Sequence, residues 1–268
     1  MAMRVMSRTE MVTVGIMGLA TAIVMAVVGW GMTDVAMVGP RAAIRVAALM
    51  PQVETTFLFL ICLPISVKLL RAESSPALRQ ALAGTWQGCR RAVWIPAGAH
   101  LKFVGKLLVA GGVVWVVASV IGAGPSLGEI LRVRLLLAAF AFFGIGLAVW
   151  ARAVWPSASA ALGACALVLV GMAAIPLAVA PVIAVVGPWK PLIQAGMLLN
   201  PWIVMAGVSR LDILHMQWVY ALSPLGAVEA YYPDLGLAIA IYGGIGLALL
   251  FLAVRILRMS VRAGVGRE

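Results

Sequence analysis

The sequence predicts an all-α integral membrane protein, a bundle of six transmembrane helices with an amphipathic cytoplasmic loop between helices two and three. Broken or re-entrant helices are expected on the outer side, between helices five and six. Of the 268 residues, 64% are hydrophobic and 11% are charged, whereas a soluble domain is about half apolar and a quarter charged. Lysine and arginine also stand in clusters beside long apolar runs, as they do at membrane boundaries.

Six apolar runs are long enough to cross a bilayer core, which takes about 20 helical residues. We therefore expect one transmembrane domain over residues 1–268, in the cell (inner) membrane. The first run is too long for the apolar region of a cleaved signal peptide, so we interpret it as a retained helix. The predicted spans are residues 11–33, 47–70, 107–127, 133–151, 157–186 and 235–257.

Charged residues and prolines set the limits of several runs. Glu54 is the single charge in the apolar stretch of the second run. Arg132 and Arg134 precede the fourth run, and Arg152 follows it. Pro156 suits the first turn of the fifth helix. That helix is long for one span, and its internal prolines predict where its regularity fails.

The stretch from residue 187 to residue 234 allows two interpretations. Two apolar pieces are interrupted, one by Asn200-Pro201 and the other by Ser223-Pro224. They form either one more helical hairpin across the membrane or re-entrant or interfacial helices. The tryptophans and tyrosines of this stretch favour the second alternative, because these side chains prefer the membrane interface. Both alternatives keep an even number of crossings.

The distribution of basic residues predicts the orientation. If both termini are cytoplasmic, 14 of the 20 lysines and arginines lie on the cytoplasmic side. This asymmetry is the positive-inside bias of membrane proteins. The net charge of +11 is therefore better explained by topology than by a nucleic-acid partner, which we do not expect.

The predicted cytoplasmic loop, residues 71–106, contains an amphipathic helix. Ser75-Pro76 suits an N-cap followed by the first helical position. Leu78 and Leu82 then begin a series of apolar residues at three- and four-residue steps. Two interpretations remain open: a basic helix that rests on anionic lipid, or a docking surface for a cytoplasmic protein.

Three motifs occur in order along the chain. Residues 71–73 (Arg-Ala-Glu) end the second helix, residues 94–108 (from Trp-Ile-Pro to Gly-Lys-Leu-Leu) open the third, and residues 222–226 (Leu-Ser-Pro-Leu-Gly) precede the last. A basic tail with Arg255 and Arg258 follows. With these motifs and the six-helix layout, nearly the whole chain resembles the ABC-2 type permeases, the membrane subunits of one class of ABC transporters.

The resemblance implies that two such chains pair, as a homodimer or with a related permease, and that ABC ATPase subunits dock on the loop. The ATPases would bind ATP and Mg²⁺, so no cofactor is expected in this chain. Their movements would pass through the loop to the helices and export a substrate. The candidate docking residues are Arg71, Glu73, Leu78, Leu82, Arg90, Arg91, Val93 and Lys106.

Other chemistries have weaker support in the sequence. Gly105-Lys106 lacks the rest of a phosphate-binding loop, and serines, histidines and acids are too few to build a catalytic site, so we do not expect an enzyme. The two histidines, His100 and His215, lie outside the clearest spans, which disfavours haem ligation. The 14 methionines suit Cu(I) as thioether ligands, but they show no repeated spacing.

The main alternative is a non-transporting membrane subunit that anchors or assembles a larger complex, such as a redox enzyme. A helix-dense chain with few polar residues in its membrane spans suits that role as well. The glycines at 144–146 and 243–246 do not distinguish the two roles, because we interpret them as close-packing positions between membrane helices.

Glu54 is the candidate functional residue within the membrane. A lone carboxylate in an apolar span is costly unless it is protonated or paired, and such residues usually face the bundle interior or a water-filled cavity. In the alternative interpretation, Glu54 is shallow and marks the start of helix two at the outer headgroups. The possible partners are Arg41, Arg45, Arg132 and Arg134.

Overall fold

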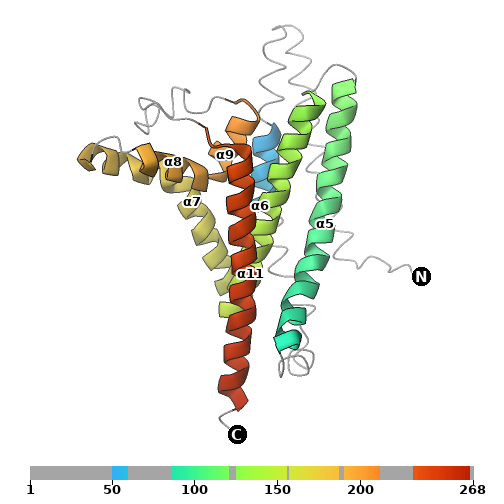
Figure 1. Ribbon diagram of the computed structural model, residues 1–268, viewed down its shortest axis with the longest axis vertical. Helices are drawn as coiled ribbons and strands as arrows, with labels where there is room; N and C mark the ends of the chain where they lie inside the picture. The colour runs from blue at the N-terminus through green and yellow to red at the C-terminus, as the bar shows by residue number, and fades with distance from the viewer. Residues whose placement is uncertain are drawn as a thin grey trace. The chain divides into compact units, whose positions relative to one another are not determined.

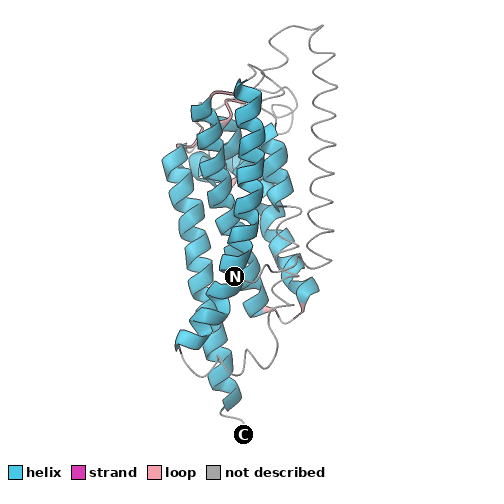
Figure 2. Cartoon of the chain, turned by 90° about the vertical axis from the view of Figure 1, so that its right-hand side faces the viewer, coloured by secondary structure: helices cyan, strands magenta, loops and turns pink. Residues whose placement is uncertain are grey.

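The computed structural model describes residues 50–59, 86–120, 125–155, 157–186, 190–211 and 232–265. All of them belong to one compact unit, residues 48–268. In these ranges the chain consists of helices and short loops, and no strand occurs (Figure 2). The predicted all-α class is therefore confirmed for the described residues. The predicted first span, residues 11–33, lies outside them.

The described helices are those of a multi-pass membrane protein (Figure 1). After a short helix at residues 50–59 come α5 (Trp86–Val120), α6 (Leu127–Val154), α7 (Ala158–Val186), α8 (Lys190–Leu199), α9 (Pro201–Val208) and α11 (Leu235–Val265). Four stretches within them are long and apolar enough to cross a membrane, or five if the bent pair α8 and α9 forms one span. The four are Gln87–Val120, Leu127–Val154, Ala158–Ile175 and Leu235–Met259.

Helix α5 differs from the predicted loop and third span. The sequence suggested a loop up to residue 106 and a separate helix from residue 107, but the structure has one helix of 35 residues that passes through Pro96. A proline removes one backbone hydrogen bond and strains the preceding turn, yet it does not end every helix. At about 1.5 Å per residue the helix is about 52 Å long, so it exceeds a hydrocarbon core of about 30 Å.

The polarity boundary in α5 nevertheless falls where the third span was predicted to begin. Arg91, Lys102 and Lys106 are exposed on this helix, and the exposed residues after them are apolar, beginning with Val109 and Val113. The sequence pattern therefore located the change in surroundings, which the prediction took for the start of a helix.

Helix α6 begins six residues before the predicted start of the fourth span, at Leu127 rather than residue 133. A capping box explains the earlier start, because Ser126 accepts a hydrogen bond from the amide of Glu129 while the Glu129 carboxylate accepts one from the amide of Ser126. The pattern Ser-x-x-Glu is visible in the sequence. Arg132 and Arg134 therefore lie inside the helix and do not mark its boundary.

The predicted break at Asn200-Pro201 is confirmed, because α8 and α9 meet there at 90°. Asn200 caps α9 by accepting hydrogen bonds from the amides of Trp202 and Ile203. Its side-chain amide donates to the carbonyls of Met172 and Ala173 in α7, at 3.1 and 3.2 Å. One buried side chain therefore holds the broken helix against α7.

The sequence of α7 explains why a carbonyl is available there. Residue 176 would normally donate its amide to the carbonyl of Met172, but Pro176 has no N–H group. A carbonyl left without a partner is costly away from water. Asn200 supplies the missing donor from a neighbouring element, which is how membrane helices accommodate proline.

Helices α6 and α11 run parallel and are in close contact at two glycines. A Cβ atom built on Gly146 would lie 2.5 Å from the carbonyl oxygen of Gly246, and one built on Gly246 would lie 2.9 Å from the ring of Phe142. The predicted close packing is thus confirmed at Gly146 and Gly246. It does not extend to Gly243, where an added Cβ would meet nothing within 4 Å.

Replacement of Gly146 by alanine should therefore separate α6 from α11. We expect a loss of about 1–3 kcal/mol, the usual cost of overpacking, measured as a lower midpoint of unfolding in detergent. The matched control is Gly243→Ala, which adds the same methyl group in open space and should leave the midpoint unchanged or raise it. Equal effects of the two substitutions would contradict the close contact.

Candidate functional site

The short helix at residues 50–59 contacts three other helices through its side chains. Glu54 reaches Arg134 of α6 and Trp115 of α5. Thr56 accepts a hydrogen bond from the indole N–H of Trp202 in α9, at 2.9 Å. This helix therefore joins the main bundle to the second half of the broken pair.

An aromatic cluster packs the helix at residues 50–59 against its neighbours. The ring of Phe59 lies 5.8 Å from that of Phe140 and 6.0 Å from that of Trp202. Phe140 in turn packs edge-on against Tyr242 of α11, with 4.6 Å between ring centroids. Such tilted and edge-on pairs are the favoured geometry of aromatic contacts. The cluster fixes the position of the short helix relative to α6 and α11, and so fixes Glu54.

Glu54 and Arg134 form an ion pair inside the bundle. The Nη2 atom of Arg134 lies 2.8 Å from Oε1 of Glu54, and the side chains are 15% and 23% exposed respectively. The indole Nε1 of Trp115 donates to the same carboxylate oxygen at 3.2 Å. Of the four arginines predicted as partners of Glu54, Arg41 and Arg45 lie outside the described residues, and Arg134 is in contact with it.

Two glycines of α5 make room for the arginine. A Cβ atom on Gly111 would lie 3.0 Å from Nη1 of Arg134, and one on Gly112 would lie 3.6 Å from its Nε atom. The guanidinium thus lies against bare helix backbone. Arg134 stands seven residues after Leu127, about 10 Å from the start of α6 at 1.5 Å per residue, so the pair is two turns inside that end of the helix.

The hydrogen bonding of this site is incomplete. Two buried polar atoms of the pair have no hydrogen-bond partner among the described residues: Oε2 of Glu54 and Nε of Arg134. Each such atom costs roughly 1–3 kcal/mol when it leaves water without a partner. The two charges compensate each other, but one acceptor and one donor of the pair remain without a hydrogen bond.

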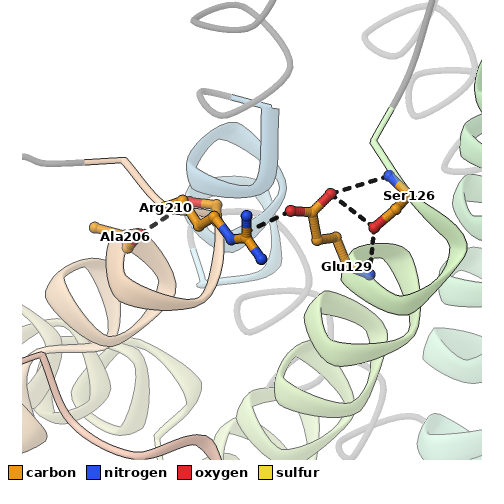
Figure 3. Close-up of polar contacts among 5 residues, drawn as sticks. Ser126, Glu129, Ala206 and Arg210 are labelled. Atoms are coloured by element: carbon orange, nitrogen blue, oxygen red, sulfur yellow. Dashed lines mark hydrogen bonds and ion pairs between the residues drawn. The ribbon is translucent and has the colours of Figure 1, made fainter. Parts of the chain in front are cut away.

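A second polar cluster lies at the same end of α6 (Figure 3). One carboxylate oxygen of Glu129 accepts from the amide and hydroxyl of Ser126. The other lies 3.3 Å from Nε of Arg210, just after α9. Glu129 thus connects the N-terminus of α6 with the C-terminus of α9.

Arg210 has a backbone conformation that usually needs glycine. It is the one non-glycine residue with positive φ among the described residues, at 55°. The amide of Leu211 donates to the carbonyl of Ala206, and that of Arg210 to the carbonyl of Gly207, which is the Schellman arrangement at a helix C-terminus. A non-glycine residue in this conformation costs about 1–2 kcal/mol.

The candidate docking residues have different positions. Arg71, Glu73, Leu78 and Leu82 lie outside the described residues. Arg90, Arg91 and Lys106 are exposed on α5. Val93 is 1% exposed in the described chain, and its part in a docking surface stays a prediction. It packs inside because it lies on the face of α5 that is turned to the bundle.

The remaining sequence hypotheses concern metals. Among the described residues, no group of three or more His, Cys, Asp or Glu side chains could hold a metal ion. Two of the methionines considered for copper, Met197 and Met205, are buried in α8 and α9, where thioether side chains fill space.

Comparison of the chain with family models, curated proteins and solved structures finds no match.

Removal of one partner of the Glu54–Arg134 pair should cost more than removal of both. We expect Glu54→Ala to lower stability by about 2–4 kcal/mol, because it leaves a guanidinium unpaired in a partly buried site. The double variant Glu54→Ala/Arg134→Ala should recover part of this loss. Trp115→Phe, which removes one donor, should cost about 0.5–1.5 kcal/mol. Unfolding midpoints in detergent provide the measurement, and additive losses would contradict a coupled pair.

Proposed function

We propose that this chain is the membrane-spanning permease subunit of an ATP-driven transporter of the ABC-2 type. In this proposal it has six spans and cytoplasmic termini in the inner membrane, and it pairs with a second permease. The observation that supports it most is the basic extension of two helices beyond membrane length. α5 has 35 residues and α11 has 31, about 52 and 46 Å, against a core of about 30 Å.

The acidic residues of the described chain lie at one end of the bundle, together with Arg132, Arg134 and Arg210, whereas the other end has exposed basic residues. The basic end has exposed Arg90 and Arg91 at the start of α5 and exposed Arg255 and Arg258 near the end of α11. All three acidic residues of the described ranges belong to the other end, which we call the acidic end: Glu54, Glu129 and Asp234. A basic end on the cytoplasmic side agrees with the positive-inside bias and offers ATPases a charged, helical docking surface.

In this proposal the intramembrane pair lies on the route of the substrate. Movement of the ATPases would tilt α5, whose glycines line the Arg134 guanidinium. A substrate with a polar group would then complete the hydrogen bonds that Glu54 and Arg134 leave unused. This differs from an anchor subunit, whose helices need no incompletely bonded charges.

The orientation can be tested by cysteine labelling of intact cells with a membrane-impermeant thiol reagent. Single cysteines at Gly39 and at exposed Asp234 should be labelled, because the proposal places both outside. Arg258→Cys is the matched control at the basic end and should be labelled only after the cells are opened. Protection of the first two positions and labelling of the third would reverse the topology.

The proposed function is tested by purification in mild detergent and identification of the bound chains. We expect an ATPase with intact nucleotide-binding motifs to co-purify. Arg91→Glu should reduce its recovery several-fold, since reversal of a charge at a docking surface weakens association. Arg132→Glu makes the same change at the acidic end and should leave recovery unchanged. Co-purification of redox or structural subunits without an ATPase would favour the anchor role.

A further inference from the structure

Helix α9 is held in two different ways at its two ends. At its start, Asn200 is buried and uses both its carbonyl and its amide group, with contacts to α9 and α7. At its end, Arg210 is 74% exposed and contacts Glu129 in a partly exposed ion pair. Water competes for the second contact and has little access to the first. The start of α9 is therefore its firm attachment. At its end the Tyr232 hydroxyl donates to the carbonyl of Leu211 at 3.4 Å, and the ion pair of Arg210, which is open to water, is the weak attachment.

Backbone strain is concentrated at the weak attachment. Residue 210 adopts a positive φ of 55°, which glycine accommodates without steric cost. An arginine is unfavourable in this backbone conformation. Its side chain, however, makes a contact with Glu129 that a glycine could not make. Strain of this kind at an exposed contact is typical of switch and clamp positions.

From these observations we infer that Arg210 and Glu129 form a latch, which holds α9 against the N-terminus of α6 and closes the acidic end of the bundle. Release of the ion pair lets α9 swing about Asn200. Trp202 lies two residues from this pivot and is bonded to Thr56, so the helix that carries the intramembrane pair stays attached while the end of α9 moves. The latch is a property of this chain and does not depend on the proposed transport function.

The latch is tested by the accessibility of Ala206, a fully buried residue of α9. The reporter is Ala206→Cys in a chain whose Cys62, Cys89 and Cys165 are replaced by alanine, placed in lipid nanodiscs. The rate of reaction with a polar thiol reagent measures how often α9 opens. Arg210→Gln and Glu129→Gln should each raise this rate about two- to five-fold, the effect of losing an exposed ion pair. The double variant should equal the single variants, because both remove one contact.

Three controls separate the latch from other effects. Arg132→Gln removes an exposed positive charge near Glu129 without breaking a contact to α9, and Ser126→Ala weakens the cap of α6 while it keeps the ion pair. Neither should raise the rate. Arg210→Gly separates the effect of the lost side-chain contact from that of the relieved backbone strain. The latch predicts that Ala206→Cys reacts faster, whereas relief of strain alone predicts that it reacts more slowly.

A second measurement avoids the cysteine reporter. Hydrogen exchange of the amides of residues 201–211 in the otherwise native chain should accelerate in Arg210→Gln and Arg210→Gly and stay unchanged in Arg132→Gln. An unchanged rate in Arg210→Gln, a slower rate in Arg210→Gly, or an equal rise in Arg132→Gln or Ser126→Ala would overturn the latch.

Discussion

The close contact of α6 and α11 at Gly146 and Gly246 sets the geometry on which the candidate site depends. Between membrane helices there is little hydrophobic driving force, so close packing of small residues takes its place. Because the two backbones approach here, Phe140 of α6 reaches Tyr242 of α11. The same aromatic cluster includes Phe59 and positions the short helix whose Glu54 meets Arg134. A change in the glycine contact would therefore alter the position of Glu54 relative to Arg134.

A second constraint comes from the backbone itself. Away from water every N–H and C=O group needs a partner, and irregular chain is tolerated only where other groups provide one. The described chain meets this demand with polar side chains at its irregular points. Asn200 bonds the carbonyl that faces Pro176, and Glu129 caps α6. Both residues also connect neighbouring elements, so the positions that satisfy the backbone are the ones that tie α7, α9 and α6 together.

The sequence was most informative where a single physical cause dominates. Apolar composition predicted the helical membrane class, and a predicted breaker at Asn200-Pro201 is the observed bend. The pairing of Glu54 followed from the cost of a lone charge, which narrowed its partner to four arginines but could not choose among them. The partner depends on where the aromatic cluster places Glu54. This cluster joins residues that are far apart in the sequence, so no local sequence pattern predicts it. The continuity of α5 through Pro96 was not predicted, because the change from basic to apolar residues near residue 107 was interpreted as the start of a helix.

The parallel course of α6 and α11 has a consequence for the charges at their ends. Two parallel helices point their macrodipoles in the same direction, which is unfavourable where they lie against each other. Glu129 lies in the first turn of α6 and Asp234 caps α11 through the amide of Leu237, while Arg152 lies in the last turn of α6. Each such charge offsets about 0.3–1 kcal/mol. The charges at the ends of α6 and α11 therefore also offset the repulsion between the aligned dipoles of the two helices, and this effect is the same in either orientation in the membrane.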